Sequence, residues 1–302
     1  MSVISTETVT AGRVVVGYDG SAGSVNALTH AARLADDRGL TLLIMMALPH
    51  LNPRVSRTAR AIKLDPDYIA HIKARAKRKL DAAAEHLGAQ YPNLTTEVAL
   101  VSANPAGALS QASQDAALVV VGVRGHSSER LSPMLGGVSG TVIAHSQGPV
   151  MVVPEGIFDM ASGPVVLGLV DAADSLAAGR VAVAEAEKRG VPLMAIYAWD
   201  IAPELGDFGA VVRLDPEQTK QDLDAMLDEL LAPLLDGHPD VQVDRRVVQA
   251  TPRAALVEAS QQASLIVMGS RGLGGFAGLL LGSVSRAVTR ESECPVIVVR
   301  QR

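Results

Sequence analysis

The chain of 302 residues contains very few cysteine and aromatic residues. Its one cysteine, Cys294, excludes an intrachain disulfide framework and fits a reducing compartment. Aromatic residues make up 3% of the chain, whereas hydrophobic residues make up 48%. The core must therefore be built from Val, Leu, Ile and Ala, which usually fill a parallel sheet covered by helices.

Long apolar runs and an excess of basic residues are missing as well. No apolar run approaches the roughly 18 residues of a membrane-spanning helix, and residues 1–13 lack the basic start and apolar centre of a signal peptide. The formal net charge of -5 implies no sustained basic surface. The seven histidines show no metal-ligand spacing. We therefore expect a cytoplasmic protein with no metal site and without a membrane or nucleic-acid partner.

The chain is a tandem repeat, because residues 118–153 are a degraded copy of residues 265–299. Each half alternates short apolar runs rich in β-branched residues with helix-like stretches, in the order β-α-β-α-β-α-β-α-β. This order predicts an α/β fold with a parallel sheet and helices on both faces. We expect one domain over residues 1–154 and another over residues 163–302, joined by a linker containing Gly and Pro at about 154–163.

Several element boundaries can be predicted. The first helix-like stretch of each half ends at a glycine, Gly39 or Gly190, the residue expected just past a helix end. A later short helix of each half opens at Pro105 or Pro252, because proline is well tolerated in a first helical turn.

The longer middle helices of the two halves differ in charge. The first is basic and the second acidic, which indicates either a docking surface or two solvated helix faces. The residues concerned are Lys73, Arg75, Lys77, Arg78 and Lys79 in the first, and Asp222, Asp224, Asp228 and Glu229 in the second.

A glycine-rich loop follows the fourth apolar run of each half. In the second half the spacing is Gly269-x2-Gly272-x9-Gly282-Ser283. Glycines let backbone N–H groups approach a phosphate, and a following helix N-terminus favours an anion. The loop leaves the carboxyl end of an expected strand, where open α/β sheets bind ligands. Ser283 is interpreted either as a ligand to the anion or as a helix N-cap.

These residues also resemble a known family. The pattern VxGxRG…GS(V)S…CPVxVV, with an Asp after the first strand, resembles the universal stress protein family over essentially the whole chain. It is most similar to the tandem-domain, ATP-binding members common in actinobacteria. The resemblance implies two Rossmann-like domains related by pseudo-twofold symmetry, each with a five-stranded parallel sheet. It also implies that the final strands, residues 150–153 and 296–299, pair with each other.

The resemblance further implies a nucleotide site in each half, for ATP with or without Mg²⁺. In the first half the implied cofactor-binding residues are Asp19, Ala47, Gly122, Arg124, Gly125, Gly136, Gly137, Val138 and Ser139. In the second half they are Asp171, Ala198, Met268, Gly269, Arg271, Gly272, Gly282, Ser283, Val284 and Ser285.

Each half departs from the family pattern at one place. In the first half ten residues, not nine, separate Gly125 from Gly136, and Gly137 replaces the family Ser or Thr. In the second half Val170 occupies the expected Asp position and Asp171 comes one residue late, a shift that a bulge absorbs. The sequence therefore predicts two nucleotide sites of unequal quality, with the better phosphate loop in the second half.

The expected function is that of a stress-response regulatory protein in which ATP occupancy changes conformation or partner binding. The chain lacks Gly-Lys-[Ser/Thr], a dehydrogenase Gly-x-Gly-x-x-Gly after its first strand, and Gly-x-Ser-x-Gly. We therefore expect no enzyme activity and no catalytic residue. A scaffold with vestigial sites and a slow ATPase or adenylating enzyme stay open as alternatives, as does a homodimer of the tandem chain.

Overall fold

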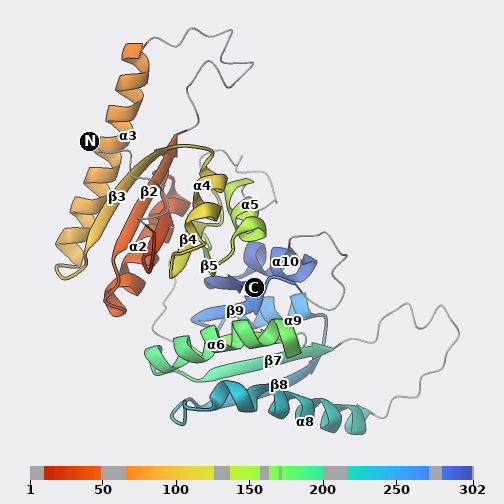
Figure 1. Ribbon diagram of the computed structural model, residues 1–302. Coiled ribbons are helices and arrows are strands. Elements are labelled where there is room, and N and C mark those ends of the chain that lie inside the picture. Colours follow the sequence, from red (N-terminus) through yellow and green to blue (C-terminus); the bar gives the residue numbers. More distant parts are fainter. Residues whose placement is uncertain are drawn as a thin grey trace, which may run out of the picture. The chain divides into compact units, whose positions relative to one another are not determined.

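A computed structural model of the protein describes residues 10–48, 66–125, 137–156, 163–169, 172–199, 216–271 and 281–300. The chain divides into two compact units, Met1–Ile157 and Phe158–Arg302 (Figure 1). Each unit has the fold expected from the sequence, a Rossmann-like α/β fold with a parallel sheet.

The first unit forms a parallel sheet in the order β3-β2-β1-β4-β5. Helix α2 contacts β1, β2 and β4, α3 contacts β2 and β3, and α4 packs beside α5 (Figure 1). Its described elements are β1 (Val14–Gly17), α2 (Ala22–Asp37), β2 (Leu42–Leu48), α3 (Pro66–Gln90), β3 (Thr96–Ser102), α4 (Pro105–Ala112), β4 (Leu118–Gly122), α5 (Gly137–His145) and β5 (Val150–Val153).

The second unit repeats this order, β8-β7-β6-β9-β10, again with parallel pairing throughout. Helix α6 packs beside α8, and α9 packs beside α10. Its described elements are β6 (Val165–Leu169), α6 (Ala172–Arg189), β7 (Leu193–Trp199), α8 (Pro216–Leu235), β8 (Val243–Gln249), α9 (Pro252–Ala259), β9 (Leu265–Gly269), α10 (Ser283–Glu291) and β10 (Val296–Val299).

The cores consist of the aliphatic residues that the composition indicates. The strands at the centre of each sheet are apolar on both faces, so Val14, Val15 and Val16 of β1 are fully buried. Each such side chain stabilises the fold by about 1.5–3 kcal/mol relative to an exposed position. The long helices α3 and α8 bury one face only, through Ala76, Leu80, Ala83 and Leu87, and through Leu227, Leu231 and Leu234.

The predicted helix boundaries are confirmed. Gly39 and Gly190 follow α2 and α6 with φ of +61° and +63°, a conformation that glycine adopts without strain. Helices α4 and α9 begin at Pro105 and Pro252, directly after the N-caps Asn104 and Thr251.

The charged faces of α3 and α8 make local ion pairs. Lys77 of α3 pairs with Asp81 one turn later at 2.8 Å. Asp228 of α8 pairs with Arg245 on the neighbouring strand β8 at 2.5 Å. These contacts are typical of solvated faces, whose pairs stabilise a protein only slightly. Among the described helices, none combines the length and apolarity needed to cross a membrane.

Candidate functional site

The strand order of the first unit places a crevice at the carboxyl ends of β1 and β4. The order reverses between these two strands, which creates the topological switch point where α/β sheets bind ligands. A cavity of about 230 Å³ lies there. Every described residue that the sequence predicts for the first-half site lines this cavity: Asp19, Ala47, Gly122, Arg124, Gly125, Gly137, Val138 and Ser139. Gly136 lies outside the described residues.

The cavity has an apolar side that the sequence motifs did not reveal. Met45 comes from β2, Leu109 from α4 and Val121 from β4, and all three side chains line it. Leu109 also contacts the end of β1, because a Cβ built on Gly17 would lie 2.8 Å from its Cδ1. These positions are hard to find from sequence, because they read as ordinary core residues until the strand order is known.

Asp19 is held at the rim by the turn that opens α2. Its Oδ1 accepts a hydrogen bond of 2.9 Å from the backbone N–H of Ser21. The hydroxyl of Ser24 accepts from the N–H groups of Asp19 and Gly20, at 3.3 and 3.0 Å. Ser21 caps the helix by accepting from Ser24 N. The exposed carboxylate is therefore fixed in position by a network within a single turn.

Close backbone contacts join this turn to the loop after β4. A Cβ on Gly23 would lie 2.3 Å from the carbonyl oxygen of Arg124, and one on Gly122 would lie 2.5 Å from the carbonyl oxygen of Gly23. A Cβ on Gly125 would lie 2.8 Å from Oδ2 of Asp19. A side chain at any of these positions requires the neighbouring group to move, so glycine allows the two loops to meet.

Arg124 supplies positive charge to the cavity. Its NH1 lies 3.6 Å from Oε2 of Glu155, which follows β5. Within the described part of the chain, its Nε is buried and makes no hydrogen bond. A buried guanidinium nitrogen without a partner is costly, so the side chain would gain from a rotation that brings its N–H groups to an anion in the cavity.

The first turn of α5 also lines the cavity. Gly137 begins this helix, and a Cβ there would meet nothing within 4 Å. The hydroxyl of Ser139 is buried and donates to the carbonyl oxygen of Val123 at 3.0 Å. The hydroxyl proton of Ser139 is thus used inside the protein. This geometry favours a role for Ser139 in positioning the helix rather than in donating to a phosphate.

Two further residues stand beside Asp19. Burial, and then the charge of Asp19, raise the pKa of Tyr18, which lines the cavity as a neutral phenol. Lys79 of α3 reaches over the turn, since a Cβ on Gly20 would lie 3.2 Å from its Nζ. The sequence shows Lys79 only as one member of a basic helix, because its contact with the turn depends on tertiary packing.

In the second unit the described site residues occupy equivalent places. By strand register Ala198 corresponds to Ala47, and Met268 and Gly269 correspond to Val121 and Gly122. Arg271 follows β9 and is exposed. Asp171 and Gly272 lie outside the described residues.

The start of α10 corrects one interpretation of Ser283. Gly282 is the N-cap, without a side-chain hydrogen bond, so Ser283 and Val284 stand in the first turn. Gly282 N donates to Ser270 O at 2.8 Å, and the hydroxyl of Ser285 donates to the same oxygen at 3.0 Å. Ser283 is therefore not the N-cap. Ser285 positions the helix as Ser139 does in the first unit.

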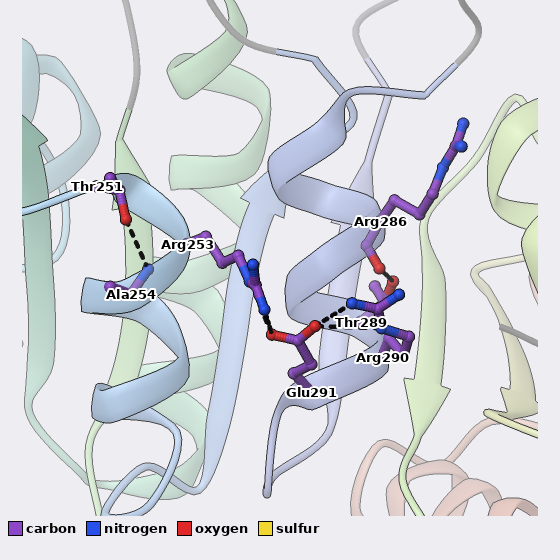
Figure 2. Close-up of polar contacts among 7 residues, drawn as sticks. All are labelled: Thr251, Arg253, Ala254, Arg286, Thr289, Arg290 and Glu291. Atoms are coloured by element: carbon purple, nitrogen blue, oxygen red, sulfur yellow. Dashed lines mark hydrogen bonds and ion pairs between the residues drawn. The ribbon is translucent and has the colours of Figure 1, made fainter. Parts of the chain in front are cut away.

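An ion-pair cluster ties α10 to α9 (Figure 2). Glu291 binds Arg253 of α9 at 2.7 Å and also binds its chain neighbour Arg290. Hydrogen bonds from Arg290 and Arg253 lower the pKa of the Glu291 carboxyl. Arg286 points away from this carboxylate (Figure 2). The cluster links α9 to α10 through side chains that are partly exposed.

Cys294 carries no sign of reactivity. It is buried directly before β10, and burial raises the pKa of its thiol to about 11. At neutral pH nearly all of it is the unreactive thiol form. Its place in the fold is that of a small apolar residue.

Comparisons with known proteins agree with this architecture. The model of the universal stress protein family matches residues 10–154 and again residues 163–300. A universal stress protein of Mycobacterium tuberculosis is 34% identical over 95% of this chain and 94% of its own length. One of Mycolicibacterium smegmatis is 35% identical over 96% of this chain and 97% of its own length.

A solved structure shares the fold at lower identity. The crystal structure of a universal stress protein from Archaeoglobus fulgidus matches with a TM-score of 0.69 at 21% identity. The match covers 96% of this chain and 98% of that chain. At this identity the likeness concerns the fold.

Proposed function

Because the chain belongs to the universal stress protein family, we propose that it is a stress-response protein that binds ATP. The site is the cavity of the first unit, with an equivalent site in the second. Nucleotide occupancy is proposed to change the conformation of the protein or its choice of partner.

One observation carries this proposal: apolar side chains and a cationic side chain line the same cavity. Met45, Leu109 and Val121 form a surface suited to a planar base. Arg124, whose Nε has no partner among the described residues, lines the same cavity as the N-terminus of α5. A helix N-terminus beside a guanidinium favours phosphate groups. An adenine nucleotide has both kinds of surface in one molecule.

Different residues of the cavity would bind different parts of the nucleotide. The apolar side would hold the base, and the fixed carboxylate of Asp19 would accept hydrogen bonds from sugar hydroxyls or the base. Arg124, Gly125 and the first turn of α5 would hold the phosphates. A cavity of about 230 Å³ is slightly below the usual size of small-molecule sites, so we expect the phosphates at its rim. A Mg²⁺ ion would accompany them mainly through phosphate oxygens and water.

The residues that line the cavity are better suited to binding a nucleotide than to catalysing its hydrolysis. Among the described residues that line it, Asp19 is the one carboxylate, and none is a histidine. Rapid hydrolysis needs a group that positions or activates water, and Asp19 already accepts a backbone hydrogen bond. We therefore propose that the protein is not an enzyme.

The test begins with the purified protein. It is denatured, and the supernatant is compared with nucleotide standards on an ion-exchange column. We expect ATP to be released. Calorimetric titration of nucleotide-free protein with ATP should then show binding that Asp19→Asn weakens by about 10-fold or more, because charge-assisted hydrogen bonds contribute about 1.5–3 kcal/mol. Asn keeps an oxygen for the Ser21 N–H, so the turn should survive.

Asp81→Asn provides the control, since it removes an exposed carboxylate paired with Lys77 on α3. Its affinity should equal that of the unmodified chain. If no nucleotide is released and none binds at millimolar concentration, the protein is a scaffold. Rapid turnover of ATP with a second substrate would instead identify an enzyme.

A further inference from the structure

We infer that Glu155 competes with the phosphates of a bound nucleotide for Arg124, and that this residue therefore sets the affinity of the first site. Nucleotide binding would in turn loosen the chain segment that leaves β5. This inference rests on the proposed function of the same cavity.

The contact between Arg124 and Glu155 is loose. The two closest atoms, NH1 and Oε2, are 3.6 Å apart, and the side chains are 32% and 55% exposed. This separation exceeds that of a good hydrogen bond. Arg124 has five N–H donors, and its buried Nε is unpartnered among the described residues. The guanidinium is therefore held weakly by the carboxylate and can turn toward a stronger anion in the cavity it lines.

A second contact places the same segment at the site. Nδ2 of Asn26, on α2, donates to the carbonyl oxygen of Gly156 at 2.7 Å. Gly156 has a φ of +123°, which glycine allows and other residues rarely adopt. Helix α2 in turn touches the loop after β4 through Gly23 and Arg124. Residues 155 and 156 are thus held by the same two elements that form the rim of the cavity.

Electrostatic repulsion between anions also opposes simultaneous binding of the phosphates and Glu155 at Arg124. A phosphate at Arg124 would bring negative charge close to the Glu155 carboxylate, and the two anions repel each other. The phosphate and the Glu155 carboxylate would also pair with the same guanidinium, that of Arg124. Each effect makes nucleotide binding and the Glu155 contact mutually unfavourable. Because coupling is reciprocal, bound nucleotide weakens the contact between Arg124 and Glu155 by the same free energy by which Glu155 weakens nucleotide binding.

The sequence of the second half has no carboxylate at the position that matches Glu155. Counted from the starts of the final strands, Val150 and Val296, the position of Glu155 corresponds to Gln301 in the second half. A neutral amide exerts no such repulsion. The two sites are thus expected to differ in affinity for a reason that lies outside the glycine loop.

The experiment compares Glu155→Gln with the unmodified chain and with Asp81→Asn, which removes a similarly exposed carboxylate away from Arg124. ATP titrations are fitted with two sites. In Glu155→Gln we expect one site to bind about 2- to 5-fold more tightly, as suits a partly exposed ion pair. In Asp81→Asn both sites should stay unchanged. Amide hydrogen exchange at residues 155 and 156 should accelerate when ATP is added to the unmodified chain, and should respond little to ATP in Glu155→Gln.

The outcomes separate this inference from the proposed function. If ATP binds all three proteins with equal affinity, or binds Glu155→Gln more weakly, the competition does not exist although the site does. Slower amide exchange at residues 155 and 156 with ATP would contradict the inference in the same way. If ATP binds none of the three proteins, the proposed function fails, and the inference fails with it.

Discussion

Glycine is required in the first unit at positions where two stretches of backbone meet. Gly23, in the first turn of α2, faces the carbonyl oxygen of Arg124, and Gly122 faces the carbonyl oxygen of Gly23. Neither contact involves a flexible side chain that could swing away. These two glycines therefore determine how closely α2 approaches the loop that carries Arg124.

We predict that Gly23→Ala destabilises the protein by about 1–3 kcal/mol, the usual cost of overpacking. It should also weaken ATP binding, because the new methyl group displaces the backbone of Arg124. Gly88→Ala is the matched control, since Gly88 lies within α3 and a Cβ there meets nothing within 4 Å. That variant should be stabilised by up to about 1 kcal/mol. Urea unfolding measures both changes, and equal midpoints for the two variants would contradict the prediction.

The sequence identifies individual residues only where a motif carries them. Gly122, Arg124 and Gly125 can be predicted from the glycine loop and the family resemblance. Gly23, Lys79 and Glu155 cannot, because their contacts with the loop depend on how α2, α3 and the end of β5 pack. The N-cap interpretation of Ser283 is wrong for a local reason: α10 begins at Ser283, so the preceding Gly282 has the extended backbone of a cap.

At the scale of elements, the alternation of apolar runs and helical stretches is sufficient to predict the fold. Glycine correctly marks the C-terminal ends of α2 and α6, and proline correctly marks the starts of α4 and α9. Both work because their backbone preferences act locally. The position of the cavity can be predicted only once the strand order is known, because β1 and β4 are neighbours in the sheet but far apart in the chain. The ion pairs that join α9 to α10 (Figure 2) also depend on packing and leave no mark in the sequence.

The Glu291 cluster makes part of the stability of the second unit depend on pH. The pKa of Glu291 is lower in the folded protein than its ordinary value of 4.5. Its stabilising effect is therefore fully present above pH 4.5 and is lost as the pH falls through the folded pKa. We predict that Glu291→Gln costs a few tenths to about 1 kcal/mol at pH 7. The cost should shrink below pH 4.5 and in high salt.

Unfolding curves between pH 3 and pH 7 measure this difference. Glu258→Gln serves as the comparison, because Glu258 is an exposed carboxylate on the adjoining helix α9. A cost for Glu291→Gln that stays constant over the whole pH range would show that the charge is irrelevant.

At the scale of the whole molecule, the chain carries the proposed nucleotide site in two different versions. The first unit holds Asp19 in a defined turn, and the second carries Ser283 where the first has Gly137. We expect one nucleotide to bind in each unit. The equivalent variants Gly125→Glu and Gly272→Glu should each remove one bound nucleotide, because both add bulk and negative charge to a glycine loop.

Equilibrium dialysis with labelled ATP measures the stoichiometry, and circular dichroism checks that each variant is folded. The double variant should bind no nucleotide. If Gly272→Glu leaves the stoichiometry unchanged, the second unit does not bind ATP. If Gly125→Glu leaves it unchanged, the cavity of the first unit is not the site.

The pairing of β1 with β4 also bears on how the protein is made. Val14 of β1 pairs with Leu118 of β4, so a central strand of the first sheet waits for a partner synthesised about a hundred residues later. Until β4 leaves the ribosome, the apolar strands β1 and β2 are without a complete sheet. Once β5 has followed, the first unit can fold while the second is still being translated. Each unit thus completes its own long-range pairing, Val14 with Leu118 and Val165 with Leu265, one after the other along the chain.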